Sequence, residues 1–382
     1  MSTVVALGAS IRHGTNAGGA VWSHVAWAQA LRDIGCRVWW LEGLNPERRN
    51  FELESYIAGV KADLAQFSLS DALVFCAWTG DPSTSVLAEH HPTFDEIAAE
   101  ADLFLNVSYF QNPRIIERFR RSVFVDTDPG LLQLWLNTGQ MTIPRHDLYF
   151  SAGAGVGKTG ARFPDCGLRW LHSPEPVYLP AWRPAAPLPD AALTTVSNWW
   201  AAQHEYILYG GQYHDNSKRA AYLRFLDLPR LAAAPLELAL TLGEADCDRQ
   251  ERQMLENAGW RVYPLNDIKW TPQAYADYVR SSRGEFACVK PFYSYLEPGL
   301  IFDRTLHYLA SGRPAIVQST GPIEYLPSDG GLFRFTTQSE ALAAIEIVCA
   351  DIEKQGTLAR KLAEEYFDAV KVVRRVLEIA LS

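Results

Sequence analysis

Residues Arg283 to Gly321 read R-G-E-F-A-C-V-K-P-F-Y-S-Y-L-E-P-G-L-I-F-D-R-T-L-H-Y-L-A-S-G-R-P-A-I-V-Q-S-T-G, and their hydrophobic pattern changes from that of a strand to that of a helix and back. Phe286 to Val289 is a short apolar run, long enough for a buried strand. Residues 291–299 carry two prolines and three aromatic side chains, a composition that predicts a loop.

A helix is predicted over residues 300–310, where apolar side chains recur at helical spacing. Gly312 and Pro314 predict its end. Ala315 to Val317 predict a second buried strand, and residues 318–321 predict a polar turn after it. The order of strand, loop, helix and strand is that of a βαβ unit in a parallel sheet, so the chain is predicted to be an α/β protein.

Charged residues lie where such a unit binds anions. Lys290 follows the first strand, and Asp303 and Arg304 lie in the first turn of the helix. Free backbone N–H groups and the helix dipole favour a negative ligand there. Lysine and arginine add the positive charge that a diphosphate needs.

The segment L-A-S-G-R-P-A-I-V, residues 309–317, resembles the E-A-x-A-x-G-x-P-V-I signature of GT-B nucleotide-sugar glycosyltransferases. This resemblance implies two Rossmann-like domains whose parallel sheets face each other across a central cleft. It implies that a nucleotide-sugar donor binds the C-terminal domain and an acceptor the N-terminal one. Many retaining members have glutamates where this chain has Gly299 and His307, so a retaining mechanism is not implied.

Fixed cations near a leaving diphosphate would stabilise its growing negative charge. We expect Arg304 and Lys290 to do this, followed by Lys218, which comes after the Gly210-Gly211 turn. Residues expected on the donor side are Lys218, Lys290, Asp303, Arg304, His307, Gly211, Ser319, Thr320 and Gly321.

An inverting transfer needs a base facing the acceptor, and His13 in the loop after the first strand is the candidate. An inverting GT-B branch resembles this arrangement, with an aspartate further along the chain that orients the histidine; Asp126 or Asp128 is predicted to do so here. The weaker candidates are His90, His91 and His172, and the expected acceptor-side loop residues are Asn16, Gly18 and Gly19.

No metal and no cofactor are predicted, and the nucleotide sugar is a co-substrate. Asp126-Thr127-Asp128 does spell the D-x-D motif that holds a metal in GT-A glycosyltransferases. Because the rest of the chain resembles the two-domain class, where cations on the protein serve instead, we expect Asp128 to cap a helix or to orient the base.

Length and composition fit this reading. A chain of 382 residues predicts two domains, at 1–180 and 191–369, joined by the proline-rich residues 171–190; the last helix, about 370–382, is expected to pack back on the first domain. The net charge of −9 weighs against binding to nucleic acid phosphates.

Six scattered cysteines and the lack of a signal peptide predict a cytoplasmic protein, and no apolar run is long enough to span a membrane. The acceptor, whether a small molecule, a glycan or a modified nucleic acid, is left open, as are the sugar, the nucleobase and the oligomeric state.

An α/β rhythm extends over the rest of the chain. Strands are predicted at 3–7, 37–41, 71–78, 103–107, 122–125 and 148–150 in the first domain and at 205–210, 236–242 and 260–264 in the second. The prediction takes residues 205–210 as the strand that opens the second domain. Long helical segments are predicted at 339–355 and 358–382.

One motif supports a rival interpretation. Ala152 to Thr159 matches a relaxed phosphate-loop pattern around Lys158 and would make the chain an NTPase or kinase. Such a loop needs a helix directly after it, and Pro164 blocks a long one. The second alternative is a non-catalytic protein of the same fold that binds a nucleotide or sugar.

Overall fold

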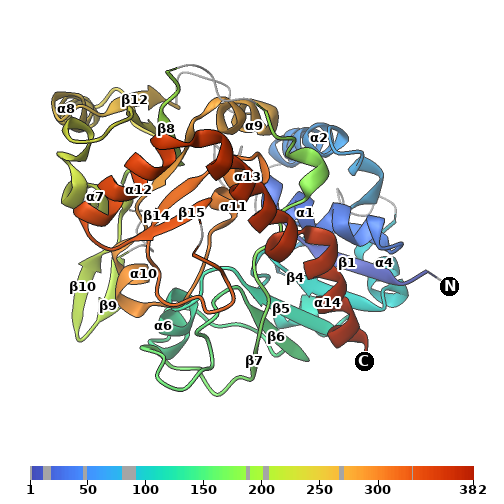
Figure 1. Ribbon diagram of the computed structural model, residues 1–382. Coiled ribbons are helices and arrows are strands. Elements are labelled where there is room, and N and C mark those ends of the chain that lie inside the picture. The colour runs from blue at the N-terminus through green and yellow to red at the C-terminus, as the bar shows by residue number, and fades with distance from the viewer. Residues whose placement is uncertain are drawn as a thin grey trace. The chain divides into compact units, whose positions relative to one another are not determined.

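The computed structural model describes residues 2–11, 19–45, 50–79, 92–185, 190–200, 206–265, 271–328 and 330–382. The chain divides into two compact units (Figure 1). Unit 1 comprises Met1–Thr159, Phe163–Tyr178 and Asp368–Ser382, and unit 2 comprises Gly160–Arg162 and Leu179–Phe367.

Among the described residues of unit 1, seven parallel strands form one sheet in the order β3-β2-β1-β4-β5-β6-β7. The strands are β1 (Val4–Gly8), β2 (Arg37–Leu44), β3 (Leu73–Ala77), β4 (Leu103–Asn106), β5 (Ser122–Asp126), β6 (Leu148–Ser151) and β7 (Trp170–His172). The helices are α1 (Ala20–Asp33), α2 (Asn50–Ala65), α4 (Phe94–Glu100), α5 (Pro113–Ile116), α6 (Leu131–Asn137) and α14 (Ala369–Leu381).

Local sequence explains where these elements begin and what they cover. Thr93 and Glu96 form a reciprocal capping box that starts α4. The last helix, α14, packs against α1, so the two ends of the chain share the core of unit 1 (Figure 1). Its buried face includes Val373 and Val376, which recur at helical spacing.

In unit 2, the described residues contain a six-stranded parallel sheet in the order β12-β11-β8-β13-β14-β15. Its strands are β8 (Leu193–Ser197), β11 (Leu236–Leu240), β12 (Arg261–Pro264), β13 (Gly284–Ala287), β14 (Ala315–Gln318) and β15 (Leu332–Phe335). The helices are α7 (Lys218–Tyr222), α8 (Asp246–Asn257), α9 (Pro272–Ser281), α10 (Pro291–Leu296), α11 (Asp303–Ala310), α12 (Gln338–Ala350) and α13 (Ile352–Leu362).

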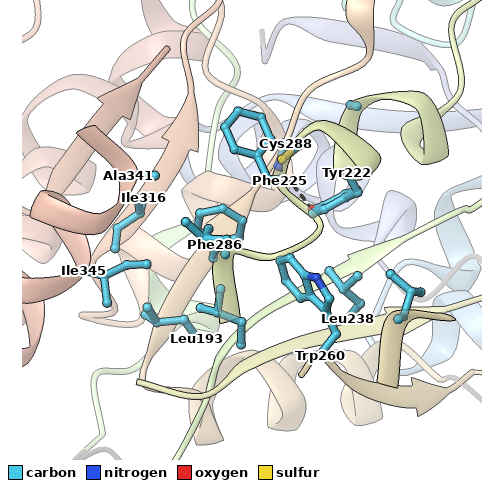
Figure 2. Close-up of a cluster of buried hydrophobic side chains, with 14 of the residues drawn as sticks. Leu193, Tyr222, Phe225, Leu238, Trp260, Phe286, Cys288, Ile316, Ala341 and Ile345 are labelled. Carbon is cyan, nitrogen blue, oxygen red and sulfur yellow. Dashed lines mark hydrogen bonds between the residues drawn. The ribbon is translucent and has the colours of Figure 1, made fainter. Parts of the chain in front are cut away.

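Aromatic and aliphatic side chains together make up the core of unit 2 (Figure 2). Phe286 of β13 stacks on Phe335 of β15 with ring centroids 5.3 Å apart and planes 9° apart. The Tyr222 hydroxyl accepts a hydrogen bond from the backbone N–H of Cys288 at 3.2 Å, drawn as a dashed line in Figure 2. This contact ties α7 to the carboxyl end of β13, next to Lys290.

In each sheet the strands that come first along the chain extend the sheet in one direction, and the later strands extend it in the opposite direction. The change of direction lies between β1 and β4 in unit 1 and between β8 and β13 in unit 2. Loops from the carboxyl ends of the two strands diverge there and leave a crevice in which α/β proteins bind ligands. Any site built on this fold is therefore expected at these two places.

The two parallel sheets confirm the predicted α/β class. One strand prediction was wrong. Residues 206–209, expected to open the second sheet, form β9 (Tyr206–Tyr209), which pairs with β10 (Gln212–Asp215) in a separate antiparallel hairpin. Gly210 and Gly211 both have positive φ, as a two-residue hairpin turn requires. The central strand is instead β8, from the sequence L-T-T-V-S.

Two other expectations were also wrong. Residues 291–296, predicted as loop, form α10, because Pro291 takes the first helical position and Glu297 ends the helix in a left-handed conformation. The C-terminal helices break at Asp351 and at Asp368, each of which caps the next helix with its side chain. Within the described parts of the chain, no helix is both long and apolar enough to cross a bilayer.

Candidate anion-binding site

The candidate site lies at the β8–β13 crossover of unit 2. The chain leaves β8 through the β9–β10 hairpin and enters α7 at Lys218. It leaves β13 through Cys288 and Val289 and reaches Lys290, the N-cap of α10, and then α11, which begins at Asp303. The carboxyl ends of two adjacent parallel strands thus bring three separated segments together.

Lys218 is fixed at this edge. Its Nζ donates a hydrogen bond to the backbone oxygen of Cys288 at 2.7 Å and lies 5.7 Å from the centroid of the Phe302 ring. Burial, and then the positive charges of Arg304 and Lys290, hold the pKa of Lys218 well below its usual range. A bound anion would relieve this repulsion, so the arrangement favours one.

Arg304 joins the two central strands. Its Nε donates to Oε1 of Glu285 at 2.7 Å, and its Nη1 donates to the backbone oxygen of Val196 at 3.1 Å. The arginine side chain is 16% exposed and the glutamate is fully buried. Burial alone would lower the pKa of Arg304. The charge of Glu285, its hydrogen bond and smaller contributions from Tyr222 and Tyr275 together outweigh burial and raise the pKa, so the guanidinium stays charged.

Two buried polar atoms near this cluster have no hydrogen-bond partner within the described chain. One is Oε2 of Glu285, and the other is Nδ2 of Asn216. Asn216 is 1% exposed, precedes the N-cap of α7, and accepts a hydrogen bond from the N–H of Phe292 at 2.9 Å. An unsatisfied donor between the Lys218 and Lys290 segments is a group that a bound oxyanion would satisfy.

Asp303 and His307 are not equivalent members of the site. Asp303 lies half-buried in the first turn of α11. His307 is 2% exposed, stacks on Trp182 with centroids 4.3 Å apart, and hydrogen-bonds the Tyr275 hydroxyl at 3.0 Å. Burial lowers its pKa to about 4, so the ring is neutral at pH 7. Because this contact places His307 in the core, we leave it out of the site.

In the turn after β14, the backbone N–H groups of Ser319 and Gly321 bond to other groups of the protein. The N–H of Ser319 donates to Phe335 O at 2.8 Å, and the N–H of Gly321 donates to the Ser319 hydroxyl at 3.2 Å. Thr320 is 3% exposed, and its hydroxyl bonds both the N–H and the oxygen of Leu300. A Cβ on Gly321 would lie 2.6 Å from that of Glu297, so close packing explains this glycine.

Gly211 lies in the turn of the β9–β10 hairpin rather than at the end of a sheet strand. The hairpin packs on α10, where the Tyr209 and Tyr295 hydroxyls are 3.2 Å apart and Tyr209 meets Phe292 edge-on. It extends the loop that leaves β8.

The acceptor-side predictions fall partly outside the described residues. His13, Asn16 and Gly18 lie there, as do His90 and His91, and Gly19 is the N-cap of α1. His172 ends β7, and burial lowers its pKa to about 4.

Asp126 is fully buried and both its oxygens are engaged. Oδ1 accepts from the Tyr109 hydroxyl at 2.9 Å and the N–H of Asp128 at 3.0 Å; Oδ2 accepts from Gln133 at 3.0 Å and Ser151 at 2.8 Å. Burial raises its pKa to about 6, although these hydrogen bonds oppose the shift. This carboxylate holds strand ends together, while Asp128 is partly exposed.

The phosphate-loop match around Lys158 lacks its required helix. Residues 152–169 are all described, and they form turns and irregular structure between β6 and β7. The structure therefore removes the basis of the NTPase interpretation. Within the described residues, no group of three or more His, Cys, Asp and Glu side chains is arranged to hold a metal ion.

The residue pattern also contained a signal that was not used. Glu285 interrupts an otherwise apolar strand, and a carboxylate there needs a cationic partner. That partner is Arg304, nineteen positions along the chain. The residue pattern held no comparable indication for Asn216, because its unsatisfied Nδ2 group results from how α7 and α10 pack together.

No protein-family model matches the chain, and no curated protein sequence does. Solved structures match over its whole length. One is an α-glucosyltransferase in complex with UDP and a 13-mer DNA, with TM-score 0.56, 10% identity and 100% of both chains covered. Another is HepE of Anabaena in complex with UDP and glucose, with TM-score 0.53, 14% identity and 99% of both chains covered.

A third is a glycosyltransferase from Rickettsia africae, with TM-score 0.56, 9% identity, and 99% of this chain and 98% of that chain covered. At such low identities the likeness is one of fold. Two parallel sheets, together with full-length coverage by these structures, establish that this chain has the GT-B fold.

Proposed function

We propose that this protein is a nucleotide-sugar-dependent glycosyltransferase of the hexosyltransferase type, whose donor diphosphate binds between Lys218, Lys290 and Arg304. The observation that carries the proposal is the convergence of these cations on the β8–β13 crossover. Arg304 and Lys290 lie close enough to Lys218 for their positive charges to lower its pKa. Similar structures bound to UDP support the same reading.

The chemistry follows from the charges. When the sugar leaves its nucleotide, negative charge grows on the departing diphosphate, and fixed cations stabilise that charge without reorganising. Arg304 is held rigidly by Glu285 and Val196, so it is already oriented before the donor binds. Lys290 supplies charge from a second segment. Lys218 adds charge from the third once the donor binds, because an anion beside it favours its protonated form.

The finer parts of the proposal come from the sequence. We assign an inverting transfer without a metal, with His13 as the base. Asp128, the more accessible of the two aspartates, is the better candidate to orient that base, because Asp126 already accepts four hydrogen bonds. A His13→Ala variant that transfers sugar at the wild-type rate would contradict this assignment.

The donor site is tested by thermal shift with UDP, dTDP, GDP and ADP. A nucleotide at about 100 times its Kd stabilises the protein by about 2.7 kcal/mol. Lys290→Ala is expected to abolish this shift and transfer, whereas Lys354→Ala, on the exposed side of α13, keeps both. No shift with any of the nucleotides, or equal shifts in Lys290→Ala, would refute the site.

A non-catalytic binding protein would give the same shifts. An enzyme and a binding protein are distinguished by incubating the protein with UDP-glucose and other UDP-sugars and measuring the UDP that is released. Slow donor hydrolysis that disappears in Lys290→Ala supports an enzyme, and binding without any turnover supports the alternative.

A further inference from the structure

We infer that a pocket at the β1–β4 crossover of unit 1 binds an uncharged saccharide, whose ring stacks on Trp78. Identifying this saccharide as the acceptor of the transfer rests on the proposed function; the binding itself does not.

The pocket has a volume of about 610 Å³ and lies along the carboxyl ends of four adjacent strands. Ser10 follows β1, Gly43 lies near the end of β2, Trp78 follows β3, and Ser108 and Tyr109 follow β4. The space suits a ligand of one or two sugar rings, since small-molecule sites in proteins begin at about 300 Å³.

Trp78 is a large aromatic side chain held in place yet left open. It is 54% exposed. The backbone N–H of Trp78 donates to Leu44 O at 2.9 Å, and its backbone oxygen accepts from Asn112 Nδ2 at 2.9 Å. The indole lies directly on Gly43: a Cβ at that position would be 2.0 Å from the indole Nε1. Glycine at 43 therefore lets the ring lie against the strand.

The polar lining matches sugar hydroxyls. The hydroxyls of Ser10 and Ser108 donate to Glu42 and to Gly8 O, and this leaves their lone pairs as acceptors. Gln111 adds an amide, which both donates and accepts. The apolar C–H face of a sugar can then lie on the indole while its rim hydroxyls meet these groups.

The lining also indicates which ligands are disfavoured. Among the described lining residues there is no Lys, Arg, Asp or Glu. A nucleic acid or an anionic glycan depends on cations for its affinity, and the chain carries a net charge of −9. The described lining therefore gives a charged ligand no counter-ion, which fits the neutral saccharide that we infer.

Hydrogen bonds to Glu42 hold the wall behind Ser10 in place. Glu42 is fully buried and accepts from Ser10 Oγ at 2.9 Å, from the N–H of Ile11 at 3.2 Å and from the Tyr56 hydroxyl at 2.8 Å. His24 Nδ1 lies 2.6 Å from Ser10 O. These contacts preorganise the pocket before any ligand arrives, which lowers the entropy cost of binding.

The test uses the full chain on an array carrying neutral glycans, anionic glycans and single-stranded DNA. Dissociation constants for the best ligand are then measured for four variants of the pocket and one control variant. We expect Trp78→Ala to weaken binding of a neutral glycan about tenfold or more and Trp78→Phe about threefold. Gly43→Ala, which displaces the indole, is expected to act like Trp78→Ala.

Gln111→Ala serves as a second probe, because this side chain is exposed and its loss leaves the fold intact; it should weaken binding severalfold. The matched control is Trp200→Ala, which removes an indole that is 41% exposed in unit 2 and should bind as the wild type does. Circular dichroism checks each variant.

The inference is overturned if no neutral glycan binds, if only anionic glycans or DNA bind, or if Trp78→Ala and Gln111→Ala both bind as the wild type does. UDP binding is measured in parallel. Glycan binding without UDP binding would support this inference and contradict the proposed function. UDP binding without glycan binding would contradict only this inference.

Discussion

Arg304 is both a candidate ligand for phosphate and a structural cation. Its partner Glu285 is completely buried, so removing the guanidinium would leave a carboxylate without its charge partner inside the sheet. Arg304→Ala is therefore expected to weaken the fold as well as the site, contrary to what its sequence position alone suggests. Lys290, which is partly exposed at the N-cap of α10, reports on ligand binding more cleanly.

Glu285→Gln should move stability and anion affinity in opposite directions. Leaving Arg304 without its charge partner is expected to cost about 3 kcal/mol of unfolding free energy. Removing the carboxylate that is bonded to Arg304 raises the positive potential at the site, so UDP should bind severalfold more tightly. Urea unfolding and calorimetric titration with UDP measure the two effects. Glu364→Gln, which breaks an exposed pair with Arg360, should change neither.

Asp126 gives a pH prediction. Its pKa of about 6 in the folded state lies above its ordinary value of 3.8, so the folded protein binds the proton more tightly than the unfolded chain. The stability that comes from this proton is present at low pH and is lost as the pH rises through 6. Lowering the pH from 7 to 5 should therefore stabilise the wild type relative to Asp126→Asn by about 1.3 kcal/mol.

Urea unfolding of both proteins at the two pH values gives this difference, and groups common to both proteins cancel. A difference that is unchanged or reversed would show that Asp126 is ionised in the folded protein throughout this range, with its four hydrogen bonds outweighing its burial.

Single residues also show what spacing leaves undetermined. Asp303 and His307 are four apart and share a helix face, so the pattern predicts that both reach the same ligand. His307 instead stacks on Trp182, which lies 125 positions earlier. A helical period fixes which residues share a face, but it does not say what that face meets.

At the scale of elements, the sequence located strands and helices that are apolar and regular. It predicted β14 and the glycine that ends α11 to within a residue. It missed β8 because L-T-T-V-S carries two threonines, although these β-branched residues suit a strand buried between neighbours. It placed β9 in the sheet because Y-I-L-Y is more hydrophobic, but β9 pairs with the neighbouring β10 across a short turn.

The last helix offers an element-scale prediction with a matched control. Val373 is fully buried in the face of α14 that belongs to unit 1, and Arg374 beside it is exposed. Val373→Asp would bury a charge and should cost more than about 3 kcal/mol of unfolding free energy. Arg374→Asp, the same new side chain one position along, should stay within about 0.5 kcal/mol.

Thermal unfolding followed by circular dichroism measures both variants. Equal stability of the two would mean that α14 contributes little to the core of unit 1. An effect confined to Val373→Asp would instead show that the chain's last fifteen residues, Asp368–Ser382, are required to complete the first unit.

For the whole molecule, the sequence predicted the α/β class and the GT-B fold from one βαβ unit and a nine-residue resemblance. It could do so because strand, helix and Gly-x-Pro turn are local features. The two crossovers were not predictable in this way, since the order of strands in a sheet depends on pairing between segments far apart in the chain. They are the features that locate both candidate sites.

Having one crossover in each unit leads to a prediction about the whole protein. If donor and acceptor occupy separate units, Lys290→Ala should abolish the UDP-induced thermal shift and leave glycan affinity unchanged. Trp78→Ala should weaken glycan binding about tenfold and leave UDP affinity unchanged. Sugar transfer should fall in both variants, because transfer needs both ligands.

Calorimetric titrations of each variant with each ligand, together with a transfer assay, make the comparison. A Trp78→Ala variant that loses UDP affinity, or a Lys290→Ala variant that loses glycan affinity, would mean that one site serves both ligands. Independent binding with joint loss of transfer would instead identify the two crossovers as the separate halves of one enzyme, each built on the sheet of its own unit.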